Sequence, residues 1–322
     1  MNRFSALLAV ALCVLPSLAE AQVLQQPDST FHPTVAEPAF SKRPLRVLFD
    51  EAHHNFHTLE GRYQAFGALM KADGCELTSS KAPLSAKTLA GFDVLVIANA
   101  LGDDPVTGTD STITRSAFSP EEIEAIDRWV RGGGAMLLIA DHAPFGSAAA
   151  ALSKRFGVDM SRGYTGDSLQ AAGSGSITNI EFLRMRGNLG SHPIMDGRNG
   201  KDRISRVVAF TGQSLLGPPG STPMMLLSDA AVDVPADAVR LAGDPRAMMS
   251  RAHSAKGRSM AVALQAGRGR VVVQGEAAML SAQVMIVPGR EPFKFGMNQP
   301  GLDNQQYALN LMRWLAGGNR GN

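Results

Sequence analysis

The sequence has little cysteine, no excess of one charge and no second long apolar segment after its N-terminus. Cysteine occurs only at Cys13 and Cys75, and Cys13 lies within the N-terminal apolar segment. If that segment is removed, Cys75 alone remains, so an intramolecular disulfide is excluded. The mature chain then depends on its hydrophobic core, and a chain of about 300 residues can bury a substantial one.

Positive and negative charges nearly cancel, with 31 Lys and Arg against 29 Asp and Glu. No block of like charge is visible, whereas nucleic-acid binding needs a basic patch or stripe. We therefore expect no nucleic-acid partner. Beyond the N-terminal segment, no apolar run is long enough to cross a bilayer, so no transmembrane segment is expected either. The oligomeric state is not indicated by the sequence.

The first 21 residues have the features of a secretory signal peptide. Arg3 supplies a basic start, residues 7–15 form an apolar stretch too short to span a bilayer, and residues 19–21 form a small-x-small cleavage site. Cys13 follows Leu12 instead of a small residue, which disfavours a lipoprotein anchor. We expect cleavage near Ala21 and a periplasmic or secreted protein.

The remaining chain predicts one folded domain. Residues 22–43 are rich in Pro, Gln and Ser and are expected to form an extended leader or linker. Over residues 44–317 strand and helix patterns alternate, which predicts a doubly wound α/β domain with a mostly parallel, flavodoxin-like sheet. Within it, residues 159–260 are expected to form a less regular, insertion-rich part. Residues 318–322 are assigned to a C-terminal tail.

Short uninterrupted apolar runs are typical of strands that are buried on both faces of a parallel sheet. Four such runs begin near Arg46, Val94, Ala135 and Val271. The segment Ser119-Pro120-Glu121-Glu122 predicts a helix start with a capping box, in which Glu122 reaches back to the Ser119 amide. Further helices are predicted over residues 147–156 and from near Asp303.

Polar residues gather where these strands are expected to end, which is where an open α/β sheet binds its ligands. The segment Asp50-Glu51-Ala52-His53-His54-Asn55-Phe56-His57 holds three of the seven histidines. Asp141-His142 follows the third run, and Glu276 follows the fourth. We expect substrate contacts from Asp50, Glu51, Asn55, Asn99, Ser281 and Gln283.

Several of these segments also carry a family resemblance. They are Phe49–His57, Val96–Ala100, Leu138–His142, Gly275–Gln283 and the closing helix from Asp303 with Trp314. In this order they resemble the class I glutamine amidotransferase-like superfamily, and within it an exported branch of domain-of-unknown-function proteins. The resemblance covers residues 44–317 and implies the fold of that superfamily. The turn that carries the nucleophilic Cys in amidotransferases here reads Asp141-His142-Ala143-Pro144, so glutamine hydrolysis through a thioester is not implied.

Two kinds of site chemistry fit these residues. His53, His57 and Asp141 are predicted ligands of one divalent metal ion (zinc, iron or manganese), although their spacing is not HExxH. Without a metal, His142 is the predicted general base beside Asp141, and Glu276 is the acid or orients the base. A serine nucleophile is not indicated, because Ser281 lacks a G-x-S-x-G elbow.

Two functions follow from these alternatives. The leading prediction is an exported hydrolase of a small or carbohydrate-like envelope substrate, with or without a metal ion. The other is a non-catalytic ligand-binding or assembly module on the same fold. In that module Asp50, Asp141 and Glu276 would cap helix ends and backbone amides, and the histidines would donate to them.

Overall fold

The computed structural model describes residues 24–102, 115–173, 176–241 and 243–317. The predicted signal peptide (1–21) and C-terminal tail (318–322) lie outside these residues. Within the described ranges, no helix is both long and apolar enough to cross a membrane.

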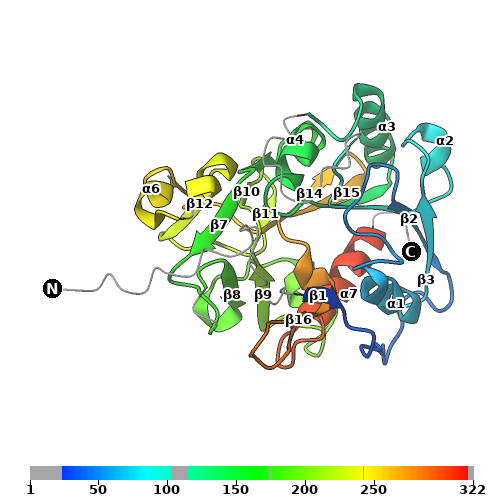
Figure 1. Ribbon diagram of the computed structural model, residues 1–322. Coiled ribbons are helices and arrows are strands. Elements are labelled where there is room, and N and C mark those ends of the chain that lie inside the picture. Colours follow the sequence, from blue (N-terminus) through cyan, green and yellow to red (C-terminus); the bar gives the residue numbers. More distant parts are fainter. Residues whose placement is uncertain (1–23, 103–114, 174–175, 242, 318–322) are drawn as a thin grey trace.

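A seven-stranded sheet forms the centre of the molecule (Figure 1). Its strands in spatial order are β11 (Thr222–Pro223), β14 (Ala261–Ala266), β15 (Gly269–Gln274), β5 (Ala135–Ile139), β4 (Val94–Ala98), β2 (Leu45–Asp50) and β3 (Cys75–Ser80). The five strands from β15 to β3 are parallel, and β14 and β11 extend the sheet in antiparallel pairs. The parallel part has the flavodoxin-like order, with its topological switch between β2 and β4. The predicted doubly wound α/β fold is confirmed.

Helices cover both faces of the sheet (Figure 1). One face carries α1 (Gln64–Ala72) and α7 (Asn304–Ala316), and the other carries α2 (Ala86–Leu89), α3 (Pro120–Arg131) and α4 (Phe145–Arg155). Alternate strand residues therefore enter two different cores, with Val96 beneath α1 and α7 but Leu95 beneath α3 and α4. Because β4 and β5 are buried at every residue, they read as uninterrupted apolar runs.

The three predicted helices are present, and the predicted start of α3 is confirmed. The Ser119 hydroxyl accepts a hydrogen bond from the Glu122 amide at 3.2 Å, and Glu122 Oε2 accepts one from the Ser119 amide at 2.9 Å. This capping box begins α3 at Pro120. The helices predicted over residues 147–156 and from near Asp303 correspond to α4 and α7.

Residues 159–260 form small sheets and short helices beside the central sheet. The strands are β6 (Asp159–Met160) with β10 (Leu215–Leu216), β7 (Tyr164–Asp167) with β12 (Ala231–Val234) and β13 (His253–Ser254), and β8 (Asn179–Leu183) with β9 (Arg206–Phe210). The short helices are η1 (Arg184–Arg186), α5 (Pro193–Asp196), η2 (Ala236–Leu241) and α6 (Pro245–Ser250).

Part of the predicted leader packs on the domain. Strand β1 (Leu24–Pro27) pairs with β16 (Ala282–Ile286), which also pairs with β17 (Phe293–Gly296). Just after β1, the buried Asp28 carboxylate accepts a hydrogen bond from Asn298 and forms an ion pair with Lys294. The described part of the leader is therefore held by hydrogen bonds and charge as well as by its extended backbone.

Candidate functional site

The carboxyl ends of four neighbouring parallel strands carry the polar residues of interest. Asp50 ends β2, Asn99 follows β4, and Asp141 and Glu276 follow β5 and β15. Their contacts divide them into two groups. We call Asp50, His53, Asn55 and Glu122 the His53 network, and we call His57, Arg62, Asn99, Asp141 and Glu276 the Asp141 cluster.

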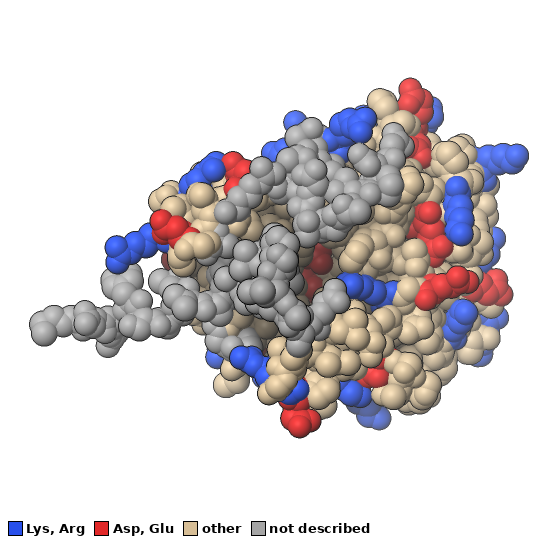
Figure 2. Space-filling model, in the orientation of Figure 1, with Lys and Arg blue, Asp and Glu red and all other residues tan. Residues whose placement is uncertain are grey.

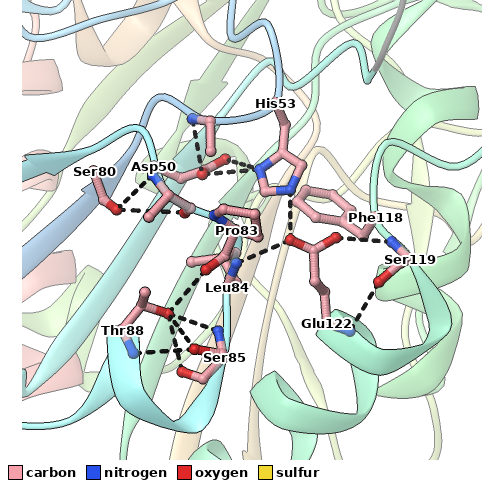
Figure 3. A network of polar contacts seen from close by, with 12 residues as sticks. Asp50, His53, Ser80, Pro83, Leu84, Ser85, Thr88, Phe118, Ser119 and Glu122 are labelled. Carbon is pink, nitrogen blue, oxygen red and sulfur yellow. Dashed lines mark hydrogen bonds and ion pairs between the residues drawn. The ribbon is translucent and has the colours of Figure 1, made fainter.

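In the His53 network the imidazole lies between two carboxylates (Figure 3). His53 Nδ1 is 2.9 Å from both oxygens of Asp50, and Nε2 is 2.9 Å from Glu122 Oε1. Burial alone would lower the pKa of His53, but the hydrogen bonds and charges of Asp50 and Glu122 raise it above its usual value. Both ring nitrogens then donate, as in an imidazolium.

The remaining polar atoms of this network are also satisfied. Asn55 accepts the His53 amide at 3.0 Å and donates to Asp50 at 3.1 Å. Glu122 Oε1 also accepts the Leu84 amide at 2.9 Å, so this carboxylate joins the start of α3 to the segment before α2. Burial would raise the pKa of Glu122, but these backbone and imidazole donors lower it. The network is closed, and it ties three separate segments together.

The donor groups do not fit the predicted metal site. Both ring nitrogens of His53 are engaged with carboxylates, so neither offers a lone pair to a metal ion. Within the described ranges, no group of three or more His, Cys, Asp or Glu side chains is arranged to hold one. His53 and His57, predicted as ligands together with Asp141, lie in different groups of contacts.

Asp141 and Glu276 form a pair of buried carboxylates. Asp141 is 8% exposed, and its carboxylate accepts a hydrogen bond from the His142 amide at 2.8 Å. Glu276 is fully buried and accepts the amides of Ala278 and Met279 at the start of η3 (Ala278–Leu280). Burial raises the pKa of both carboxyls, and the charge of Asp141 raises the pKa of Glu276 further. Each carboxyl therefore holds its proton up to a higher pH than an isolated carboxyl would.

Residues 57–63, after β2, bring two basic side chains to this pair. His57 is buried and stacks on Tyr63, with ring centroids 4.8 Å apart. Burial, with the nearby charge of Arg62, lowers the pKa of His57 to about 3, so its imidazole is neutral. Burial also lowers the pKa of Arg62, against the opposing charge of Asp141. The Arg62 guanidinium lies 4.6 Å over the ring of Phe56.

Asn99 connects this cluster to the strand ends. Its φ of 50° is left-handed, a conformation that Asn adopts more readily than most residues. Its Oδ1 accepts the Asp141 amide at 2.9 Å, and its backbone oxygen accepts the Phe56 amide at 2.9 Å. Asn99 Nδ2 and His57 Nδ1 are buried without a hydrogen-bond partner in the described structure. Such atoms cost about 1–3 kcal/mol each, so they mark positions that need an explanation.

His142 lies at the rim of the cluster, half-buried. Its Nδ1 is 2.7 Å from the Ala143 carbonyl oxygen, which can only accept, so Nδ1 carries hydrogen. In the tautomer that bears hydrogen on Nδ1, Nε2 is the acceptor. The imidazole stacks on Tyr164 at 4.6 Å and contacts Phe145, which in turn contacts Phe56.

On the face drawn in Figure 2, basic and acidic side chains are interspersed, and acidic atoms are also recessed near its centre.

The other predicted contact residues have partners elsewhere. Glu51 accepts the Leu59 amide at 2.9 Å, and the exposed His54 has a left-handed φ of 48°. Ser281 donates to the Ala278 carbonyl, and Gln283 bonds both Ser281 and Gln25, which joins β16 to β1. These contacts satisfy Ser281 and Gln283 inside the domain.

The structure thus brings Asn99, Asp141, His142 and Glu276 together with His57. The sequence interpretation did not include Arg62 and Tyr63, which lie just before α1, and assigned Glu122 only to a helix cap. No local signal identifies Glu122 as a partner of His53, because 69 residues separate the two.

Comparisons with known proteins concern the fold. No protein-family model and no curated protein sequence matches the chain. The mmIFT52 N-terminal domain is 12% identical and aligns with 86% of this chain and 100% of its own, with a TM-score of 0.57. A ThuA-like protein from Bacteroides uniformis (11% identity, 88% and 94% covered) gives a TM-score of 0.40. A GMP synthase homologue from Thermoplasma acidophilum (10%, 86% and 94%) gives 0.35.

These last two proteins have glutamine amidotransferase-like folds, and their structural similarity to this chain is low. The strand order shows a doubly wound α/β fold, and the structural similarity to the mmIFT52 domain agrees with this fold.

Proposed function

We propose that this chain is an exported hydrolase, which acts at the Asp141 cluster on a small polar or carbohydrate-like substrate of the cell envelope. The supporting observation is the pair of buried carboxyls of Asp141 and Glu276, whose pKa values are raised, followed directly in sequence by the His142 imidazole, whose Nδ1 is held by the Ala143 carbonyl. Groups with shifted pKa values gather at sites of acid–base chemistry. No metal ion enters the proposal, because no group of three or more His, Cys, Asp or Glu side chains is arranged to hold one in the part of the chain that the structure describes.

In this mechanism His142 is the general base. Its Nδ1–H is held by the Ala143 carbonyl, so Nε2 takes a proton from water while Asp141 orients that water. The water oxygen bonds to the electrophilic carbon of the substrate, the bond to the leaving group breaks, and the proton on His142 passes to the leaving group. Glu276 is fully buried and is a positioning residue that acts through Asp141.

The substrate class is proposed from the rim. Phe56, which is 42% exposed, and Phe145 lie beside His142 and Tyr164. Ligand sites commonly combine aromatic side chains with a few placed polar groups, and a sugar ring has an apolar face that packs on such rings.

The test uses protein recovered from the periplasm or medium of cells that express the full sequence. N-terminal sequencing is expected to give Gln22 as the first residue. The protein is assayed with panels of chromogenic glycosides and esters. Asp141→Asn and His142→Gln are expected to lower turnover about a hundredfold or more, as loss of acid–base groups does. His54→Ala, at an exposed side chain, is the matched control and should leave turnover unchanged.

Unaltered turnover in both site variants would contradict the proposal. The alternative, a non-catalytic binding module, is favoured if a panel compound raises the melting temperature but none is converted. The complete burial of Glu276 is the observation that favours this second function.

A further inference from the structure

Three donor groups of the Asp141 cluster lack a full set of hydrogen bonds among the described residues, although Asn99 also acts on the Asp141 carboxyl and the Phe56 backbone acts on His57. Asn99 Nδ2 and His57 Nδ1 are buried and unbonded among the described residues. Within the same residues, no hydrogen bond or close ion pair engages the Arg62 guanidinium, whose neighbour is the ring of Phe56.

Three other partly buried guanidinium groups are paired with carboxylates, whereas Arg270 bonds the Trp314 carbonyl and lies over the Trp314 ring. Arg313 lies 2.7 Å from Asp73, and Arg258 lies 2.9 Å from Asp159. Arg184 makes an ion pair with Asp196 at 3.0 Å. Arg62 differs from these residues, because the nearby Asp141 acts on it only through its charge.

The three side chains lie in one neighbourhood, because the ring of Phe56 contacts both Arg62 and His57. The charge of Arg62 influences both Asp141 and His57, which places all three in one electrostatic neighbourhood. Asn99 holds the Asp141 amide with its side-chain oxygen. The Asn99 carbonyl also accepts the amide of Phe56, the residue on whose ring Arg62 lies.

We propose that Arg62, Asn99 and His57 bind a carboxylate group of the substrate, so that the substrate is an acidic small molecule such as an acidic sugar. A guanidinium matches a carboxylate with two parallel hydrogen bonds. The amide of Asn99 adds a third donor, and neutral His57 donates from Nδ1 in the matching tautomer. This inference rests on the proposed function and names the substrate class of the same site.

Access and charge set two conditions for binding. Asn99 Nδ2 and His57 Nδ1 are closed to solvent, so ligand binding requires that the side chains around them move, and Arg62 is the partly exposed member of the three. A bound carboxylate adds negative charge beside Asp141 and Glu276, which favours a second proton on that pair. Among the described residues, the other charged or titratable groups that act on the pair are Arg62, His142, Tyr63 and Tyr307. Affinity should therefore rise as the pH falls.

The experiment measures binding by calorimetry, independently of turnover. The wild-type protein is titrated with acetate, with D-glucuronate and with neutral D-glucose, and the histidine ring resonances are followed by NMR. D-Glucuronate is expected to bind at least about tenfold more tightly than D-glucose, as a charge-assisted hydrogen-bond pair implies. Its binding should shift the His57 resonances and raise the pKa of His57 from about 3.

Two variants and one control locate the site. Arg62→Met removes the cation, and Asn99→Asp places a like charge there while keeping a residue that tolerates the left-handed backbone. Each should weaken glucuronate binding at least about tenfold. Arg128→Met, at a side chain that is 71% exposed, should not weaken it. Melting curves establish that each variant is folded.

The inference is overturned if neither carboxylate binds, if D-glucose binds as tightly as D-glucuronate, or if folded Arg62→Met binds like the wild type. Its failure can be told apart from failure of the proposed function. Arg62-dependent binding without any turnover removes the hydrolase and keeps the carboxylate site. Asp141-dependent turnover of neutral substrates, without carboxylate binding, does the reverse.

Discussion

The His53 network and the Asp141 cluster lie at the ends of neighbouring strands and are both rich in carboxylates, yet they differ in how their polar atoms are satisfied. In the first, both ring nitrogens of His53 bond to carboxylates, and Asn55 bonds within the network. In the second, His57 and Asn99 each leave a buried atom unbonded in the described structure. A closed set of hydrogen bonds stabilises the fold, whereas an open set leaves donors for a ligand.

Among the residues of these two groups, removing His53 should give the largest effect on stability. In His53→Ala, Asp50 and Glu122 remain largely buried without the cation between them, which should lower the free energy of unfolding by about 3–5 kcal/mol. Urea unfolding measures the loss. His54→Ala, at the adjacent exposed residue, should stay within about 0.5 kcal/mol of the wild type. Equal stabilities of the two variants would show that the network does not stabilise the fold.

Asp141→Asn should lower turnover strongly and change stability little. The substitution replaces the buried carboxyl that raises the pKa of Glu276 with a neutral amide of the same shape, so the melting temperature should change little. Turnover should fall about a hundredfold or more under the proposed mechanism. A large loss of stability with turnover intact would show that Asp141 stabilises the fold and does not take part in catalysis.

The two histidines should respond to pH with opposite sign. The pKa of His53 is raised in the folded protein, so its contribution is fully present below its unfolded value near 6.5 and is lost as the pH rises through the raised value. The pKa of His57 is lowered to about 3, so its contribution is present above 6.5 and is lost as the pH falls toward 3. Each slope is limited to about 1.4 kcal/mol per pH unit.

Urea unfolding of His53→Gln and His57→Gln across the pH range separates these terms. The cost of His53→Gln should shrink at alkaline pH, and the cost of His57→Gln should shrink at acid pH. Parallel pH profiles for the two variants would contradict the assignment of the two residues to different groups.

Arg62→Met should have the smallest effect on stability. Because no hydrogen bond or close ion pair holds its guanidinium in the described structure, the free energy of unfolding should change by about 0.5 kcal/mol or less. Arg313→Met is the comparison, since it breaks a buried pair with Asp73 and should cost about 3–5 kcal/mol. A comparable loss for Arg62 would mean that it supports the fold.

Most of the sheet could be predicted because its central strands are locally distinctive. β4 and β5 are buried on both faces and read as apolar runs, and the capping box fixes the start of α3. β3 is harder to recognise, since it lies at the sheet edge with a largely polar sequence. β14 was also not predicted, and its alanine-rich sequence has no uninterrupted β-branched run.

The location of the site also followed from the strand ends, but its connectivity did not. The metal prediction grouped His53 with His57 because they are close in sequence. In the structure the left-handed residue His54 lies between them, and the two rings contact different partners. The partners that decide their roles, Glu122 and Arg62, are determined by tertiary packing and are not encoded in any local pattern.

Glu122 serves three segments with two oxygens. It caps α3 through Ser119, holds the Leu84 amide and contacts His53. Gln at this position would keep an acceptor for the cap but would lose the negative charge that faces the imidazolium. Among homologous sequences we therefore expect positions 53 and 122 to vary jointly, whereas position 119 is free to alternate between Ser and Thr. The substitutions that are tolerated at His53, after the end of β2, would thus depend on Glu122, which lies 69 residues away in the chain.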